Sequence, residues 1–209
     1  MDYYESSQYH VPFGNDLRPS EETELIHIFD NISSMTKGDL KIHLDNVSNR
    51  GRSDWAREYQ GRGSWGMQSP LMAALQNKRQ DLVEVMVKRF GLRIDSSFDH
   101  DGFPVTPSSP TQTVPLTKAS VLSYAAAGGF APGKDEDQVR FLFYKMKAKV
   151  NININGTTPL IAAICSHSRN LSMVKLLVEE LKADVNFRAS INRDGSNPYL
   201  ALHAAIAVE

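Results

Sequence analysis

The sequence has little of what disulfide-stapled, secreted or membrane-spanning proteins need. Its single cysteine, Cys165, cannot form an intrachain disulfide, which favours a reducing compartment. No apolar run approaches the roughly 20 residues of a membrane helix, and the N-terminus lacks the basic start and apolar stretch of a secretory signal. We therefore expect an intracellular protein, cytoplasmic or nuclear, that does not bind a membrane.

The sequence also has no large excess of positive or negative charge and few reactive side chains close together. The formal net charge is −1, so the chain as a whole is not drawn to nucleic acid. The six histidines do not combine with Cys165 or with carboxylates at metal-ligand spacing. Gly128 to Lys134 has the glycine and lysine spacing of a phosphate loop, but Asp135 follows where Ser or Thr would bind magnesium. We expect no catalytic residue, no cofactor and no metal.

What the sequence does contain is a repeated pattern. Segments that begin at Val83, Val139 and Val174 each reach an Asp or Asn after 12 residues, and each carries apolar residues at helical spacing. Before each comes a Leu followed by an Ala pair or triplet. Ser or Thr ahead of this Leu can cap a helix, and Pro fits its first turn. The three starts read Ser69-Pro70-Leu71, Ser120-Val121-Leu122 and Thr158-Pro159-Leu160.

Such a unit consists of two short helices and a tail, and it resembles the ankyrin repeat. The resemblance covers about residues 67–205 and implies an all-α solenoid of helix-turn-helix units with short β-turn fingers and long inter-repeat insertions. Asn155-Gly156 fits a two-residue hairpin turn in one such finger. Within the repeat region 67–209, the units are expected at about 67–95, 119–151 and 155–186, with a partial unit at 198–209.

The partial unit begins at Leu202-His203-Ala204-Ala205 and stops before a second helix. An apolar stripe on the third unit would then lack a polar cover, which favours a piece of a longer repeat protein. His203 occupies the ankyrin position where His commonly ties the local backbone by hydrogen bonds. We expect the same structural role here.

The segments around the units have different compositions. Residues 1–19 are polar and aperiodic and are predicted to be a disordered tail, whereas 20–47 contain two amphipathic stretches and are predicted to be a degenerate first repeat or cap. Residues 48–66 are predicted to be a flexible linker. Residues 96–119 are rich in Ser, Pro and Thr, which predicts an extended, mobile loop.

Because no reactive cluster is present, the surface is the candidate for function. We predict a non-enzymatic module that binds a segment of a partner protein in the concave groove of the solenoid. Near this groove, acidic residues stand beside aromatic ones, an arrangement suited to a basic peptide end. The alternative for the acidic residues is that they form turns together with glycine. The candidate partner-binding residues are Asp99, Asp101, Tyr124 and Phe130.

A narrower resemblance concerns the order of the units. A helix-pair start, a long tail with Asp-Gly, an Ala-rich second unit and a Thr-Pro-Leu third unit look like the N-terminal half of the Fem family. This resemblance implies a substrate receptor of a cullin–RING ubiquitin ligase, which binds C-terminal tails that often end in Arg. In that family the Asp of a Phe-Asp-Gly motif helps to hold the basic end. Asp101-Gly102 matches its last two residues, and His100 replaces the Phe.

A third alternative is a nucleic-acid-binding or nucleotide-binding protein. Residues 48–66 mix four Arg with three aromatic residues, a composition found in proteins that bind single strands. Two acidic residues interrupt the stretch, and the second support for this alternative is only the incomplete phosphate-loop spacing at Gly128 to Lys134. We expect a protein or peptide partner and no nucleic acid.

Overall fold

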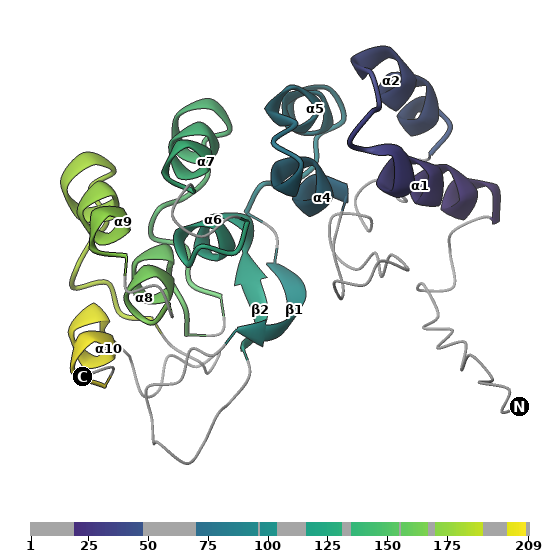
Figure 1. Cartoon of the computed structure of the whole chain (residues 1–209). Coiled ribbons are helices and arrows are strands. Elements are labelled where there is room, and N and C mark those ends of the chain that lie inside the picture. Colours follow the sequence, from purple (N-terminus) through teal and green to yellow (C-terminus); the bar gives the residue numbers. More distant parts are fainter. Residues whose placement is uncertain are drawn as a thin grey trace, which may run out of the picture.

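The computed structural model describes residues 19–47, 70–95, 97–103, 116–130, 135–154, 156–166, 170–189 and 200–207. Within these ranges all helices except the last one come in pairs, and the pairs stand side by side (Figure 1). The first helices of the pairs form one row and the second helices form another row above it. This arrangement confirms the predicted stack of helix-turn-helix units. The predicted tail, apart from Pro19, and the predicted linker lie outside the described residues.

The first pair consists of α1 (Pro19–Asn31) and α2 (Lys37–Asp45), within the region predicted as a cap or degenerate repeat. The second helix begins at a capping box. Thr36 Oγ1 accepts a hydrogen bond from the Asp39 backbone N–H at 3.1 Å, and the Asp39 carboxylate accepts one from the Thr36 N–H at 3.2 Å. Two backbone donors at the helix start are thereby satisfied.

The later first helices are short and rich in Ala. Ser120 and Thr158 cap two of them, because each side-chain oxygen accepts a hydrogen bond from the backbone N–H three residues on. Pro159 occupies the first turn, where its missing N–H costs nothing. These helices are α4 (Pro70–Gln76), α6 (Val121–Ala126), α8 (Pro159–Ile164) and α10 (Ala201–Ala207).

Each later second helix starts as an α-helix and continues as a π-helix. The wider turn is closed by bonds over five residues, such as Met146 N–H to Phe141 O at 3.2 Å and Leu181 N–H to Leu176 O at 3.0 Å. Sequence periodicity does not show this change of helix type. The helices are α5 (Gln80–Glu84) with η1 (Val85–Arg89), α7 (Glu136–Arg140) with η2 (Phe141–Lys145), and α9 (Leu171–Lys175) with η3 (Leu176–Glu180).

The three later second helices all end in the same way. The residue eight positions after the leading Val has a positive φ, which reverses the chain at the helix end: Gly91 at 71°, Lys147 at 61° and Lys182 at 59°. The next residue then donates its N–H to a carbonyl six residues back. These bonds are Leu92 to Met86 at 3.1 Å, Ala148 to Leu142 at 3.0 Å and Ala183 to Leu177 at 2.8 Å. The common geometry shows that the three segments are structurally equivalent.

The prediction of a mobile loop over 96–119 was wrong at both ends of the segment. β1 (Ser97–Phe103) and β2 (Leu116–Ser120) pair as an antiparallel two-stranded sheet with Asp99 opposite Lys118. The finger between the first two units is therefore an extended hairpin, and β2 leads directly into α6. The next finger is short. Ile154 and Thr157 exchange backbone hydrogen bonds at 3.0 Å around Gly156, whose φ of 80° suits the predicted two-residue turn.

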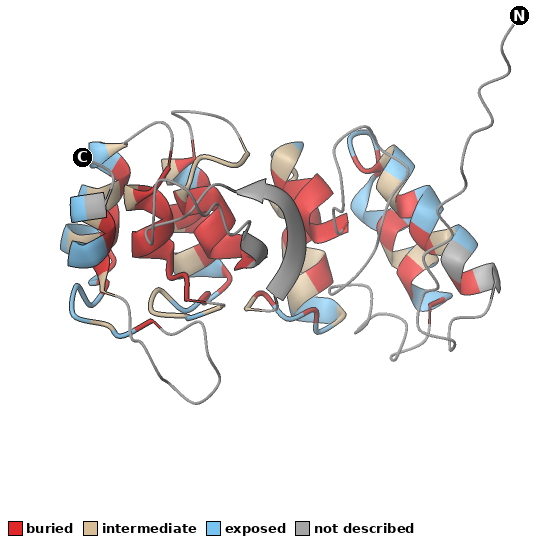
Figure 2. Ribbon diagram, turned by 90° about the horizontal axis from the view of Figure 1, so that it is seen from below, coloured by how far each residue is buried: buried red, intermediate tan, exposed pale blue. Residues whose placement is uncertain are grey.

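One hydrophobic core runs through the described units. Figure 2, seen from the side of the first helices, shows buried residues concentrated on those helices. The predicted faces of the second helices contribute, although Val87, Phe90 and Val174 are only partly buried. At the end of the row, Leu202 and Ile206 on α10 are each 64% exposed while Ala201 and Ala204 are buried. The largest fully buried side chains are Leu25, Ile28, Leu40, Leu44, Met72, Leu75, Leu82, Met86, Leu122, Leu142 and Ile161.

Candidate protein-binding surface

The hairpin β1–β2 and helix α6 form the part of the structure that contains the candidate binding residues. The two strands lie on the side of the first helices (Figure 1). Ser120 joins them to α6, since it ends β2 and its Oγ accepts the Ser123 N–H at 3.0 Å. Asp99 and Asp101 both belong to β1. Asp99 is opposite Lys118, whereas Asp101 lies between Asp99 and Phe103, where the register is irregular.

Tyr124 and Phe130 come together on the other side of this junction. Their rings meet edge to face with centroids 5.0 Å apart. Tyr124 is only 8% exposed, and burial raises the pKa of its hydroxyl. A Cβ added to Gly129 would lie 2.4 to 2.6 Å from the Tyr124 ring, so glycine is required for this packing. Tyr124 thus has a structural role in the core, and little of its surface is left for a partner.

The binding role of Asp99, Asp101, Tyr124 and Phe130 stays a prediction. The structure places the acidic pair on β1, Tyr124 within α6, and Phe130 in the segment that follows α6. Phe130 is partly buried against the core, and its backbone N–H donates to Asp135 Oδ2 at 3.2 Å. The Asp135 side chain, which breaks the phosphate-loop pattern, therefore holds the turn that follows α6. Part of that pattern, residues 131–134, lies outside the described residues.

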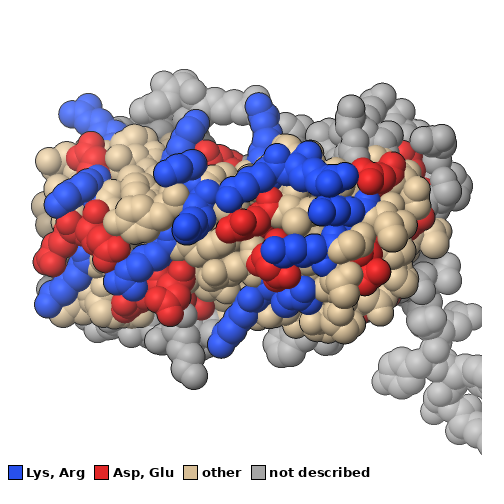
Figure 3. Space-filling model, turned by 90° about the horizontal axis from the view of Figure 1, so that it is seen from above, with Lys and Arg blue, Asp and Glu red and all other residues tan. Residues whose placement is uncertain are grey.

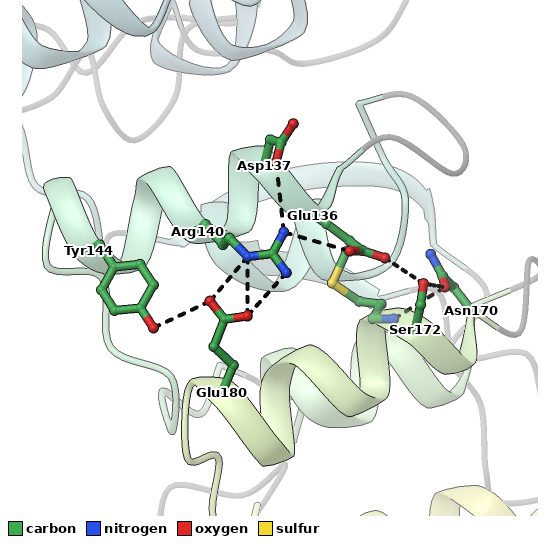
Figure 4. A network of polar contacts seen from close by, with 8 residues as sticks. Glu136, Asp137, Arg140, Tyr144, Asn170, Ser172 and Glu180 are labelled. Carbon is green, nitrogen blue, oxygen red and sulfur yellow. Dashed lines mark hydrogen bonds and ion pairs between the residues drawn. The ribbon is translucent and has the colours of Figure 1, made fainter.

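The second helices carry a polar network that sequence reasoning missed (Figure 4). Arg140 Nε and Nη2 on α7 donate to the Glu180 carboxylate on η3 at 3.1 to 3.2 Å, and Tyr144 Oη donates to it at 3.3 Å. The hydrogen bond with Arg140 lowers the pKa of Glu180, and the same bond raises the pKa of Arg140. Ser172 Oγ donates to Glu136 Oε1 at 2.5 Å and adds a second link between these repeats.

Other units are joined by buried or half-buried polar side chains. Gln138 is 5% exposed, and its Nε2 donates to the Leu75 carbonyl at 2.8 Å. Arg79 connects the first repeat to the helix pair before it, because its guanidinium donates to carbonyls that follow α1. Within that first pair, Glu24 contacts His43 at 2.5 Å, and this hydrogen bond lowers the pKa of Glu24. Contacts between residues this far apart in the sequence cannot be predicted from a local sequence pattern.

Two remaining reactive side chains, His203 and Cys165, have structural roles. His203 Nδ1 accepts the Leu200 N–H at 3.2 Å, which confirms its predicted tie to the local backbone. Cys165 is buried, and desolvation raises its pKa to about 11, so it is a weak nucleophile at neutral pH. His167 lies outside the described residues. In the part of the chain that is described, no group of three or more His, Cys, Asp or Glu side chains is arranged to hold a metal ion.

Comparisons with known proteins give one family. Residues 155–190 match the Ankyrin repeat family. This range begins at the two-residue turn and includes α8, α9 and η3, the unit in which the cap, the Ala-rich helix and the tail follow the expected order. No curated protein matches the chain at a significant level. None of the described helices is long and apolar enough to cross a membrane.

Proposed function

We propose that this chain is a non-enzymatic module that holds a segment of a partner protein. Residues 155–190 match the Ankyrin repeat family, whose repeats generally mediate binding to protein partners. The fold presents a long surface and buries the chain's only thiol, so binding is the role its geometry supports best. The buried free cysteine also supports an intracellular location, cytoplasmic or nuclear.

The binding site we propose is the groove beside the first helices, at the extended finger. The observation that carries this proposal is the hairpin β1–β2, which stands on the side of the first helices and continues into α6 (Figure 1). A finger of this length adds surface next to the row of first helices. Asp99 and Asp101 on β1 supply acidic groups, which favours a basic partner segment.

A more specific candidate is a receptor of the Fem type, which presents substrates to a cullin–RING ubiquitin ligase. One observation favours it: Asp101-Gly102 belongs to strand β1 of the extended finger, beside the proposed groove. In this proposal Asp101 holds the Arg at the end of a substrate tail through charge-assisted hydrogen bonds. Affinity capture with the full chain, followed by mass spectrometry, tests it. Cullin components among the captured proteins support the receptor, and their absence leaves only the general module.

Binding itself is tested with a peptide that ends in Arg and carries a fluorophore at its other end. We expect Asp101→Ala to weaken binding by about tenfold or more, because it removes one partner of a charge pair. Asp137→Ala is the matched control, since the Asp137 side chain is 93% exposed on α7, among the second helices. Equal affinities of the two variants would show that Asp101 does not belong to the binding site. If the natural chain bound a peptide ending in Glu equally well, the partner segment would not need to be basic.

The nucleic-acid alternative depends on residues 48–66, which lie outside the described residues. It predicts a gel shift with single-stranded RNA or DNA that weakens steeply with salt. Our proposal expects no shift at low salt.

A further inference from the structure

Three lysines at the end of the second repeat share one exposed surface. Lys145, Lys147 and Lys149 are exposed, whereas Met146 and Ala148 between them are 5% and 3% exposed. The alternation has a structural cause. The chain leaves η2 through Lys147 in a left-handed conformation, and the residues on either side of it turn into the core. The three ammonium groups are therefore held outside on the same stretch of chain.

The first repeat continues this charge. Arg89 and Arg93 lie six and ten residues after Val83, which are the positions of Lys145 and Lys149 relative to Val139. The two tails are in direct contact, because the Lys149 N–H donates to Asp95 Oδ1 at 2.9 Å. Figure 3, which looks onto the second helices, shows many Lys and Arg side chains on this face, with Asp and Glu among them. We call Arg89, Arg93, Lys145, Lys147 and Lys149 the basic surface.

Ion pairs between described residues account for little of the charge of Arg89 and the three lysines, whereas Arg93 has an interaction of its own. Arg89 lies 3.9 Å from Asp45, at the limit of an ion pair, and the two side chains are 53% and 58% exposed. Lys145, Lys147 and Lys149 form no ion pair with any described residue. A cation in the last helical turn is favoured by the helix dipole, which explains Lys145. Lys149 lies beyond the helix end, where this effect fades.

The basic surface is limited in length. In the third repeat the positions of Lys145 and Lys149 are taken by Glu180 and Asp184, and only Lys182, at the position of Lys147, remains basic. At the other end stands Asp45. The surface thus covers two neighbouring repeats, or about 20 Å if packed helices lie 8 to 10 Å apart. An extended chain of about six residues spans this distance.

We propose that the basic surface binds a short acidic segment of a partner protein. The site differs in place and in sign from the proposed groove, so the two can be occupied by different segments. Carboxylates at alternate positions of an extended segment would meet cations from both repeats, which gives charge complementarity along the whole surface. A nucleic-acid strand fits less well, because its regular row of phosphates would run on to Glu180 and Asp184.

The test uses the full chain and a fluorescent hexaglutamate peptide at low salt. The variant Lys145→Gln/Lys147→Gln/Lys149→Gln removes three charges of the basic surface. The control Lys37→Gln/Lys41→Gln/Lys175→Gln removes three charges from α2 and α9. We expect the first to bind about tenfold more weakly than the natural chain and the control to stay within about twofold. Binding should also weaken between about 50 and 200 mM salt.

Several results would overturn the proposal. Equal affinities of the two triple variants would show that only the net charge matters. Absence of binding by the natural chain at a peptide concentration of about 1 mM would remove the site. Tighter binding of an oligothymidine than of hexaglutamate would assign the surface to nucleic acid instead. Circular dichroism verifies that the variants are folded, and the single variants Lys145→Gln and Lys149→Gln replace the triple variant if it unfolds.

Discussion

Asp95 and Lys149 join two consecutive repeats, because Asp95 Oδ1 accepts the Lys149 backbone N–H at 2.9 Å. One repeat further along the stack, Asn151 Oδ1 accepts the Asp184 N–H at the same distance of 2.9 Å. Asp95 and Asn151 both end the tail of their repeat, 12 residues after the leading Val. The structure thus gives a physical reason for the final Asp or Asn of the repeated pattern: it binds the next tail.

Removal of these acceptors should loosen the stack. We expect Asp95→Ala and Asn151→Ala each to lower the free energy of unfolding by about 1 kcal/mol, the typical net value of one hydrogen bond. Urea unfolding followed by circular dichroism measures this change. Asn186→Ala is the control, because Asn186 has the equivalent position but its side chain makes no such bond to a described residue. A loss at Asn186 as large as at Asn151 would contradict the explanation.

The contact between Gly129 and Tyr124 predicts a severe effect of one methyl group. Gly129→Ala would place a Cβ 2.4 Å from the Tyr124 ring, which must move within a packed core. We expect a destabilisation of about 1 to 3 kcal/mol, measured as a lower midpoint of thermal unfolding. A smaller side chain in the variant Tyr124→Leu should recover part of this loss, because the two changes are coupled.

The same substitution elsewhere gives the control. Gly38 lies in α2, where an added Cβ would meet Thr36 Oγ1 at 3.5 Å, an ordinary van der Waals contact. Gly38→Ala should stabilise the chain by up to about 1 kcal/mol, since alanine favours the helix. If both substitutions changed the stability in the same direction, the close packing at Tyr124 would not be the cause of the effect at Gly129.

Much of the fold could be predicted because each repeat is built from local signals. The caps at Thr36, Ser120 and Thr158, the Ala-rich helices and the equivalent tails follow from short stretches of sequence. The hairpin β1–β2 did not follow, since Ser, Pro and Thr between two units are typical of a loop and strand pairing is a non-local property. A local signal for the position of Tyr124 did exist: Gly128-Gly129 directly after an Ala-rich helix indicates close packing of the backbone.

The candidate surfaces were harder to predict. Asp99 and Asp101 were assigned from composition, and the structure adds that they belong to a paired strand. Arg140 with Glu180, and Gln138 with Leu75, are contacts between repeats that the spacing within one repeat cannot show. The basic surface also depends on which tails are neighbours. Its equivalent positions could be read from the sequence once the repeats were aligned, but its contacts could not.

Arg79 should be a main support of the first helix pair. Its guanidinium donates to the carbonyls of Ile32, Ser33 and Met35 at 2.7 to 3.1 Å and also pairs with Asp81. We expect Arg79→Lys to cost about 1.5 to 3 kcal/mol, because a single ammonium cannot reach all these oxygens. Hydrogen exchange of the α1 and α2 amides should become faster than that of the amides in α8.

The control for this prediction is another arginine of the same repeat. Arg89 is 53% exposed and only 3.9 Å from Asp45, so Arg89→Lys should change the stability by less than about 0.5 kcal/mol. Uniformly faster exchange in every helix of the Arg79 variant would mean that Arg79 supports the whole stack. Faster exchange confined to α1 and α2 would identify it as the link between the first helix pair and the repeats.

The bond between Arg140 and Glu180 predicts a dependence of stability on pH. Hydrogen bonding to Arg140 lowers the pKa of Glu180 from its ordinary value of 4.5 in the folded chain. A carboxylate with a lowered folded pKa stabilises the fold above its unfolded pKa, and this contribution is lost as the pH falls through the folded pKa. The stability difference between the natural chain and Glu180→Gln should therefore be larger at about pH 7 than at about pH 3. Both side chains are more than one third exposed, so added salt should reduce the difference at neutral pH.

Glu179→Gln, next to Glu180 in the sequence, tests whether loss of any negative charge on this helix has the same effect. Urea unfolding at the two pH values decides the matter, and a Glu180→Gln difference that does not change with pH would show that the contact contributes no charge-dependent stability.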